Sequence, residues 1–278
     1  MSGEFTLLLP VYGGNSPAQL VEAFESSVGR QELVPDAVVV VEDGPLPREL
    51  SHVLDRLASE GPAPVHRERL ARNAGLATAL NAGLEVVSTE YVARMDADDI
   101  SDPARFARQL PVARERGLDV LGSGLAEFVG STDHVAAVRV PPLGADEIRR
   151  VAGFRQPFHH PTVVLRREAV IGVGGYPTGV GRFEDYVMFA RLIAAGAAVD
   201  NIPDPLLFYR VDDGAYTRRG GWGQFRSEWS LQRELRRSHL TTRAQWARNL
   251  LVRGPYRLVP ARLREKVYRR FATQTPGA

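Results

Sequence analysis

Four short predicted strands, three of them apolar runs, occupy the first 130 residues of this chain, and each is followed by a segment with helical spacing. The second run, Ala37–Val41, is an alanine followed by four valines. A β-branched run without polar alternation is typical of a parallel strand that is covered on both faces. Strands that alternate with helices build a doubly wound sheet, because each crossover places a helix on one face. We therefore predict an α/β fold with a mostly parallel, twisted sheet flanked by helices.

The boundaries of the elements follow from apolar spacing and from breaking residues. Strands are predicted over Phe5–Leu9, Ala37–Val41, Val65–Arg67 and Tyr91–Met95, and helices over Pro17–Val28, Arg48–Leu57, Ala74–Val87 and from Asp102-Pro103 to about Arg116. Asp102-Pro103 is a helix-start signature, in which the aspartate caps the helix and the proline lies in its first turn. Further along, strands are predicted over Asp119–Val129, Val135–Val140 and Thr162–Leu165, helices over Ala145–Val151, Arg167–Ile171 and Phe183–Ala195, and an extended run over Ala198–Tyr209.

Charge divides the chain at about residue 217. From Arg218 to the C-terminus there are 15 basic and 3 acidic residues, whereas residues 1–217 carry 20 basic and 30 acidic residues. All three tryptophans lie in the basic segment, which has the spacing of two or three amphipathic helices. We predict a body over 1–217, with halves at about 1–130 and 131–217, and a basic helical extension over 218–278.

Missing motifs exclude several classes of protein. The chain has no cysteine, which excludes disulfides, thiolate metal sites and cysteine catalysis. It has neither a Gly-x-x-x-x-Gly-Lys-Ser/Thr phosphate loop nor a Gly-x-Ser-x-Gly nucleophile elbow. The N-terminus lacks the basic region of a signal peptide, and no run of about 18 apolar residues is present. We therefore expect a cytoplasmic protein without a transmembrane helix.

Polar residues follow four of the predicted strands. The clusters are Pro10-Val11-Tyr12, Glu42-Asp43-Gly44, Arg72-Asn73-Ala74-Gly75 and Asp96-Ala97-Asp98-Asp99. Loops after strands are normally polar, so ordinary turn chemistry explains any one of these clusters. Four clusters at the carboxyl edge of one sheet, where open parallel sheets bind their ligands, indicate a common ligand.

The acidic cluster is the most informative of the four. Asp96, Asp98 and Asp99 repel one another unless a cation neutralises them, and sites with only oxygen ligands suit Mg²⁺ or Mn²⁺. The alternative is a solvated loop that caps the next helix, and Asp102 fits that role. We predict that the Asp96–Asp99 group binds a divalent metal ion.

A second acidic pair, Glu184-Asp185, opens the predicted helix Phe183–Ala195. Acidic residues favour helix N-termini through the dipole, and the functional alternative is a general base. Adjacent helical residues point about 100° apart, so only one of the two is expected to face a substrate. The pair His159-His160 lacks the spacing of a metal site, and we expect one histidine to pack or bond to the backbone and the other to touch a ligand.

Taken together and in this order, the motifs resemble family 2 glycosyltransferases of the GT-A, Rossmann-like fold. The resemblance covers about residues 4–215 and includes Gly174-Gly175-Tyr176 and Phe183-Glu184-Asp185-Tyr186 besides the four clusters. The stretches 41–45, 94–100 and 216–221 look closest to the branch that builds bacterial exopolysaccharides, such as amylovoran-type enzymes. The resemblance implies an inverting, metal-dependent hexosyltransferase that uses a nucleotide-sugar, with UDP-hexose as the expected donor and a lipid-linked glycan as the expected acceptor.

The resemblance implies a role for each matching residue. Pro10 is assigned to the nucleotide, Tyr12 and Asp43 to its base, and Arg72 and Asn73 to the border of base and ribose. Asp96 and Asp98 match the family's Asp-x-Asp motif, with Asp98 or Asp99 as the metal ligand and Asp96 nearer the ribose or sugar. Glu184 and Asp185 match the Glu-Asp motif, whose second residue is the usual base.

One position departs from the family pattern. Family members often have a metal-binding histidine after the last strand, but residues 209–214 contain none. The third protein ligand of the metal is therefore open. Arg218 and Arg219 follow this stretch, and they could clamp the diphosphate instead.

Two other functions are weighed against this one. A sugar nucleotidyltransferase normally has a loop rich in glycine and arginine after the first strand, and here the loop Gly13–Ser16 has no basic residue. A non-catalytic nucleotide-sugar-binding scaffold is the second alternative, and the presence of Asp98 and Asp185 argues against it.

The basic extension has two open interpretations. Its helices either cover the body or contact an anionic membrane, which would be the inner face of the plasma membrane, since arginine and tryptophan favour such surfaces. Nucleic-acid binding is not expected, because no recognition motif accompanies the charge.

Overall fold

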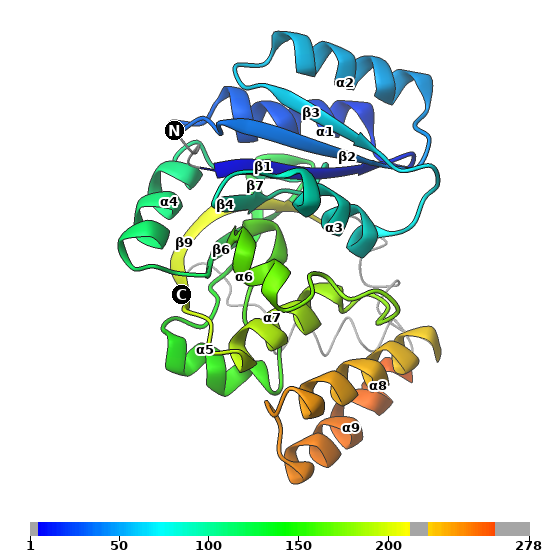
Figure 1. Cartoon of the computed structure of the whole chain (residues 1–278), viewed down its shortest axis with the longest axis vertical. Helices are drawn as coiled ribbons and strands as arrows, with labels where there is room; N and C mark the ends of the chain where they lie inside the picture. The colour runs from blue at the N-terminus through cyan, green and yellow to red at the C-terminus, as the bar shows by residue number, and fades with distance from the viewer. Residues whose placement is uncertain (1–4, 212–221, 259–278) are drawn as a thin grey trace.

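The computed structural model describes residues 5–211 and 222–258, which form one mixed sheet with helices on both faces (Figure 1). The strands are β1 (Phe5–Tyr12), β2 (Ala37–Asp43), β3 (Val65–Arg69), β4 (Tyr91–Arg94), β5 (Ile100–Ser101), β6 (Val120–Val129), β7 (Ser131–Arg139), β8 (Val164–Arg166) and β9 (Val199–Arg210). The helices are α1 (Pro17–Phe24), α2 (Arg48–Glu60), α3 (Leu76–Val86), α4 (Arg105–Glu115), α5 (Ala145–Ala152), α6 (Arg167–Gly172), α7 (Glu184–Ala194), α8 (Trp222–Arg237) and α9 (Arg243–Leu258).

The sheet has a parallel half and a mixed half. Its order is β3-β2-β1-β4-β8-β6-β9-β5, with β7 beside β6. The first four strands in this order are parallel to one another, as the strand–helix alternation of the first 130 residues predicts. In the second half β8 is antiparallel to both β4 and β6, whereas β6 and β9 are parallel. The α/β fold is therefore confirmed, and its fully parallel part consists of the N-terminal strands β1–β4.

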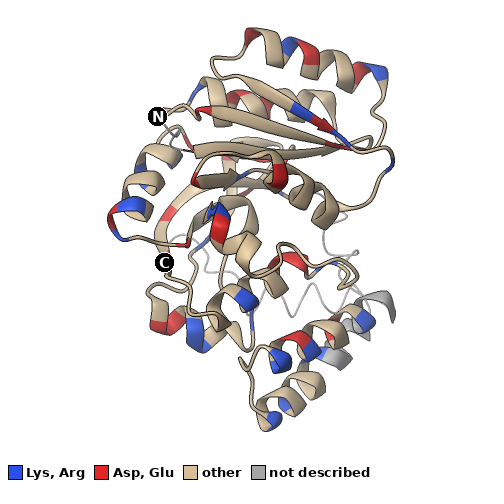
Figure 2. Cartoon of the chain, viewed as in Figure 1, with Lys and Arg blue, Asp and Glu red and all other residues tan. Residues whose placement is uncertain are grey.

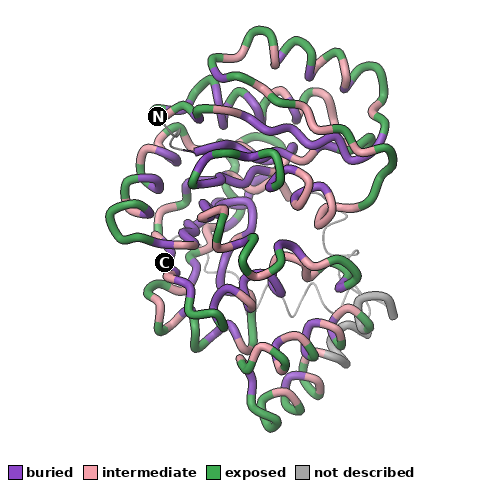
Figure 3. The backbone as a smooth tube through the Cα atoms, in the orientation of Figure 1, coloured by how far each residue is buried: buried purple, intermediate pink, exposed green. Residues whose placement is uncertain are grey.

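Two apolar layers hold the helices on the sheet. Phe5, Leu7 and Leu9 of β1 face one buried cluster, which α1, α2 and α4 complete. Leu8 faces the opposite cluster, to which α3 and α7 contribute. Both faces of β1 are buried, which explains why its sequence is apolar without alternation. Figure 3 shows this burial concentrated in the strands and on the inner sides of the helices.

The helix predicted to start at Asp102-Pro103 starts two residues later in the structure. The helix α4 begins at Arg105, because Asp102 is still tied to the sheet through its N–H, which donates to Leu206 O at 3.1 Å. The Asp102 carboxylate accepts the N–H of Ala104 at 2.9 Å, so it caps the turn that precedes the helix. The two-residue strand β5, which lies just before this turn and pairs with β9, is not predicted from the sequence.

The helix predicted over Pro17–Val28 changes its pitch near its end. The α-helix stops at Phe24 and is followed by a π-helical turn over Glu25–Gly29. Ser26 and Ser27 donate their hydroxyls to Ala23 O at 3.0 and 2.7 Å. These bonds supply the carbonyl with partners that the helix backbone would otherwise provide, so the wider turn is tolerated.

The basic extension packs on the body through α8. Leu231 and Leu235 of α8 are buried against α7 in a third apolar cluster, with Val187 among their partners. In Figure 1 the α8–α9 hairpin lies at the end of the molecule opposite α2. The predicted boundary at residue 217 lies outside the described residues, as do Arg218 and Arg219. Within the parts that the structure describes, no helix combines the length and the apolar character needed to cross a bilayer.

Candidate active site

The carboxyl ends of the parallel strands bring the predicted clusters to one edge. Tyr12 at the end of β1 is paired in register with Asp43 at the end of β2. On the other side of β1, Leu8 pairs with Arg94, the last residue of β4. The acidic loop therefore leaves the sheet next to β1, on the same edge as Tyr12 and Asp43. The common edge predicted from the sequence is present.

Asp43 holds the loop that contains Arg72 and Asn73. Its two carboxylate oxygens accept the N–H groups of Ala74 and Gly75 at 2.6 and 3.0 Å, and Asn73 Nδ2 donates to Asp43 O at 3.3 Å. Arg72 and Asn73 themselves are exposed beyond this anchor. The arrangement fixes the backbone of the loop and keeps the side chains of Arg72 and Asn73 at the exposed edge.

Glycine is required at position 44 because the backbone of Arg72 and Asn73 passes very close to it. It has φ +86°, and a Cβ at this position would lie 2.4 Å from Asn73 N. Any other residue would be strained and would push the loop away from β2.

Tyr12 supplies an aromatic surface at this edge. Its side chain is 49% exposed although it ends a buried strand. Its N–H donates to Asn15 Oδ1 at 2.8 Å, and Tyr12 O accepts the Asn15 N–H at 3.0 Å, so the turn after β1 is fixed. Pro10 lies two residues earlier and is half-buried. An exposed ring on a rigid turn can stack on a planar group.

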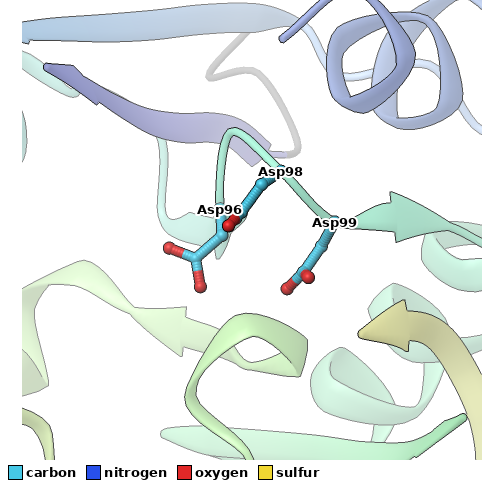
Figure 4. A group of neighbouring side chains, drawn as sticks. All are labelled: Asp96, Asp98 and Asp99. Atoms are coloured by element: carbon cyan, nitrogen blue, oxygen red, sulfur yellow. The ribbon is translucent and has the colours of Figure 1, made fainter. Parts of the chain in front are cut away.

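The three carboxylates of the acidic loop lie together. Oxygens of Asp96, Asp98 and Asp99 are all within 4.8 Å of one another. Figure 4 shows the side chains leaving the single loop between β4 and β5, with Asp96 and Asp99 directed to the same side. The alternative of a wholly solvated loop is wrong for Asp99, which is buried.

Asp99 has the features of a cation ligand. Its Oδ1 accepts the N–H of Arg210 at 2.9 Å, whereas its Oδ2 is buried and has no hydrogen-bond partner among the described residues. Burial and the neighbouring charges of Asp96 and Asp98 hold the pKa of Asp99 well above its usual range. A divalent cation would lower that pKa and would give Oδ2 a partner, so these carboxylates fit Mg²⁺ or Mn²⁺.

Two buried arginines lie under the acidic loop. Arg94 is 2% exposed and forms an ion pair with Asp96. Arg105 is completely buried and donates to Arg94 O at 2.7 Å, and burial next to Arg94 lowers the pKa of Arg105 to about 9. These arginines offset part of the negative charge of the three carboxylates.

Arg210 fixes the loop from the opposite side. Its Nε donates to Asp98 O at 2.8 Å, and its Nη2 pairs with Glu22 at 2.6 Å. The guanidinium also lies 4.6 Å from the ring centre of Phe128. Arg210 falls in the stretch 209–214, in which the expected histidine is missing. The backbone between Asp98 and Asp99 is thereby tied to β9.

Asp185 is held by side chains from another part of the chain. Its Oδ2 accepts Gln156 Nε2 at 2.6 Å and lies 3.8 Å from His160 Nδ1, and its Oδ1 accepts the Tyr186 N–H at 2.7 Å. Burial raises the pKa of Asp185, while the bonds from Gln156 and Tyr186 lower it. The carboxylate is fixed in one orientation and is more basic than a solvated aspartate.

His160 is neutral in this setting. Burial and the charge of Arg94 hold the pKa of His160 well below its usual value. Its Nε2 is 3.0 Å from the Tyr176 hydroxyl, so the ring bridges Tyr176 and Asp185. Of the two histidines noted in the sequence, His160 is thus the one that faces the candidate site.

Glu184, the other member of the pair, is also less acidic than a solvated carboxyl group. Burial and the charge of Asp185 raise the pKa of Glu184 to about 7, and its Oε2 is buried without a hydrogen-bond partner in the described part of the chain. The charge of Arg94 acts on both Glu184 and Asp185, as it does on Asp99. Arg94 therefore connects the acidic loop electrostatically with the acidic pair on α7.

Three contributors are missed from the sequence. Gln156 lies in a loop without a motif, and Arg105 and Arg210 look like surface arginines. A weak signal exists for Arg105, because it falls on the apolar side of α4 beside Phe106, where an unpaired surface charge is not expected. The predicted contributors Arg218 and Arg219 lie outside the described residues.

Comparisons with known proteins agree on one family. Residues 6–174 match the model of Glycosyl transferase family 2. The chain is 33% identical over 264 residues to the amylovoran biosynthesis glycosyltransferase AmsE of Erwinia amylovora, covering 95% of this chain and 97% of the relative. It is 30% identical over 273 residues to the UDP-Gal:alpha-D-GlcNAc-diphosphoundecaprenol beta-1,3-galactosyltransferase of Escherichia coli, covering 96% and 98%.

A solved structure supports the same fold. The mannosyltransferase PcManGT of Pyrobaculum calidifontis, determined with GDP-Man and Mn²⁺, superposes with a TM-score of 0.66 at 17% identity. The match covers 99% of this chain and 77% of the mannosyltransferase.

Proposed function

The chain belongs to glycosyltransferase family 2, and we propose that it is an inverting enzyme that moves a hexose from UDP-hexose to a hydroxyl of a glycan acceptor. The relatives named for polysaccharide biosynthesis support a role in building a bacterial polysaccharide, and one of them is named for a lipid-linked acceptor. The observation that carries the proposal is that two acidic groups share the buried charge of Arg94. The Asp96–Asp99 group suits a cation, and Asp185 suits a base.

The nucleotide is assigned to the edge formed by β1 and β2. Tyr12 would stack on the base, with Pro10 beside it, because its exposed ring stands on a fixed turn. Asp43 would accept a hydrogen bond from the base, since each carboxylate oxygen has a second acceptor site besides the bond to the Arg72–Gly75 loop. Arg72 and Asn73 would border the base and ribose, and Asp96 would lie nearer the ribose or sugar.

The metal is assigned to the acidic loop. Asp98 and Asp99 would hold Mn²⁺ or Mg²⁺, with Asp96 beside them, and the ion would offset the charge that the leaving diphosphate gains. The only protein ligands proposed are carboxylates, because Arg210 cannot coordinate a cation. Arg218 and Arg219, outside the described residues, are proposed to contact the diphosphate.

The base is assigned to Asp185. In the transfer the acceptor oxygen forms a bond to the anomeric carbon, the bond from that carbon to the diphosphate oxygen breaks, and the hydroxyl proton passes to the Asp185 carboxylate. Gln156 and His160 keep the carboxylate in place, and burial keeps it basic. Glu184 has a free buried oxygen beside it, which would accept a hydrogen bond from the acceptor.

Titration calorimetry tests the donor half of the proposal. UDP is expected to bind the purified protein when Mn²⁺ is present, and to bind at least about tenfold more weakly after EDTA, because the diphosphate then loses its counter-ion. A donor screen with UDP-hexoses would follow. If neither UDP, GDP nor dTDP binds under either condition, the proposed donor site is wrong, and a nucleotide-sugar-binding scaffold is not supported either.

We further propose that the α8–α9 hairpin contacts an anionic membrane surface. Residues 226–253 carry seven arginines and two glutamates, and arginines lie along both helices (Figure 2). Apolar side chains are exposed among them: Leu251 is 76% exposed, and Trp229 is 44% exposed with its ring 5.7 Å from that of Trp246. Exposed apolar and aromatic groups surrounded by arginine suit the interface of a bilayer that contains anionic lipid.

Liposome co-sedimentation tests this contact. The full chain is expected to pellet with vesicles that contain phosphatidylglycerol, and Leu251→Glu is expected to lower binding about tenfold, since a leucine in the interface contributes roughly 1.5–3 kcal/mol. Val129→Glu is the matched control, because Val129 is also exposed but lies at the end of β6. If both variants pellet to the same extent as the wild type, the hairpin does not form the membrane contact.

A further inference from the structure

We infer that the α8–α9 hairpin is part of the catalytic apparatus, because it positions the proposed base through the segment 153–156. The inference rests on the proposed function, in which Asp185 accepts the acceptor proton. Asp185 is held by Gln156, and Gln156 lies between α5 and the 3₁₀ turn His160–Thr162, in a stretch with no regular structure. Contacts with other parts of the chain are therefore needed to fix the backbone of this stretch.

Side chains from two helices bind three consecutive carbonyls just before Gln156. The Tyr186 hydroxyl of α7 donates to Ala152 O at 2.8 Å. Asn249 Nδ2 of α9 donates to Gly153 O at 2.7 Å, and Arg253 Nη1 of α9 donates to Phe154 O. The last turn of α5 leaves its carbonyls without helical partners, and these donors supply them. The backbone that leads to Gln156 is thus bonded directly to the hairpin.

The hairpin presents these donors from a rigid interior. Glu228, Gln232 and Asn249 are almost completely buried between α8 and α9. Asn249 Nδ2 also bonds to Gln232 Oε1 at 3.1 Å, and Arg253 Nε pairs with Glu228 at 2.6 Å. Buried polar groups that satisfy one another leave few alternative arrangements, because breaking any one bond strands a charge or an amide.

The fit at Gly153 shows how closely the two parts meet. A Cβ on Gly153 would lie 2.8 Å from Leu240 O, which belongs to the turn between α8 and α9. Gly153 has φ −73°, a value that alanine adopts without strain. Gly153→Ala would therefore act only by pushing the hairpin away from the segment, without removing any hydrogen-bonding group.

These contacts form a continuous path from α9 through residues 153 and 154 to Gln156 and Asp185. A base must lie within hydrogen-bond reach of the proton that it takes, and small displacements lower the rate steeply. None of the hydrogen bonds named in this path involves β1, β2 or the acidic loop. Loosening the hairpin is thus expected to lower kcat and to leave nucleotide affinity unchanged, so Asn249 and Arg253 are positioning residues.

Hydrogen exchange on the full chain tests the physical link. In Asn249→Ala and in Gly153→Ala, the peptide that covers residues 153–162 is expected to exchange several-fold faster, while the β1 peptide keeps its rate. Arg243→Ala is the matched control on α9, since Arg243 is exposed at the first turn. Unchanged exchange over 153–162 in both test variants would overturn the inference. This readout needs no activity, so it decides on the link even if no sugar transfer is found and the proposed function fails.

A double-mutant cycle tests the catalytic consequence. Asn249→Ala is expected to lower kcat about tenfold or more at unchanged UDP affinity. In a Gln156→Ala background the same change is expected to lower kcat less than about twofold, because the path is already broken. A full loss in that background, or a parallel loss of UDP affinity, would show that Asn249 supports the fold in general and would refute its positioning role.

Discussion

Asp185→Asn is expected to lower kcat by about 10³-fold or more, within the range that a general base contributes, while UDP affinity stays within a few-fold. Asparagine has nearly the same shape, and its oxygen can still accept the Tyr186 N–H that Asp185 accepts at 2.7 Å. It cannot take up a proton, so only the transfer step loses its base. Single-turnover kinetics with a radiolabelled donor would measure the loss, and calorimetry would measure the nucleotide affinity.

The dependence of the transfer rate on pH provides a second test of Asp185 as the base. Burial raises the pKa of Asp185 above that of a solvated aspartate, and only the ionised form accepts a proton. The rate of the wild type should therefore fall as the pH is lowered through this raised pKa. The residual rate of Asp185→Asn should lack that acidic limb. Near-full turnover in the variant would mean that another group is the base, and Glu184, with its pKa of about 7, would be examined first.

Asp98→Ala is expected to abolish the gain in UDP affinity that Mn²⁺ provides and to lower kcat/KM about 100-fold or more, since a bound cation contributes several kcal/mol of charge stabilisation. Asp98 is the exposed member of the cluster, whereas Asp99 is buried and bonded to the Arg210 N–H. Its removal should thus affect the ion more than the fold. Calorimetric titrations of UDP at increasing Mn²⁺ concentration would measure the effect.

Asp102→Ala provides a control on the same loop. Asp102 accepts the Ala104 N–H at 2.9 Å, and loss of such a cap costs about 1 kcal/mol of stability. This variant should melt at a lower temperature but keep the full response of UDP binding to Mn²⁺. If Asp98→Ala also keeps that response, the acidic loop does not hold the metal.

The part of the site that we propose for the donor is predictable because its signals are local. Each of Tyr12, Asp43 and Asp98 follows a strand that its own apolar run reveals, and parallel strands place their carboxyl ends on one edge. The register that pairs Tyr12 with Asp43 is not predicted, because the strands predicted over 5–9 and 37–41 extend to Tyr12 and Asp43 in the structure.

The part that we propose for the acceptor depends on contacts between distant residues, and these leave little trace in a sequence. Gln156 and Asp185 are 29 residues apart, and Asn249 reaches Gly153 across 96 residues. Asp102 shows the same effect at short range. Its sequence signals a helix start, but pairing of the neighbouring β5 with β9 keeps the chain extended and delays the helix to Arg105. At Gln156 and Asn249, long-range contacts build an arrangement that no local pattern marks. At Asp102, long-range strand pairing overrides a local preference for helix.

Arg94 also sets a limit on how such a chain can evolve. Most of the proposed donor residues come from the first 100 positions, and the acidic pair comes from a separate stretch. Arg94 couples the two, because its buried charge pairs with Asp96 and also lowers the pKa of Glu184 and of Asp185. A change of this residue alters both halves at once. Changes that alter only one half are therefore expected at residues that leave the shared charge of Arg94 untouched.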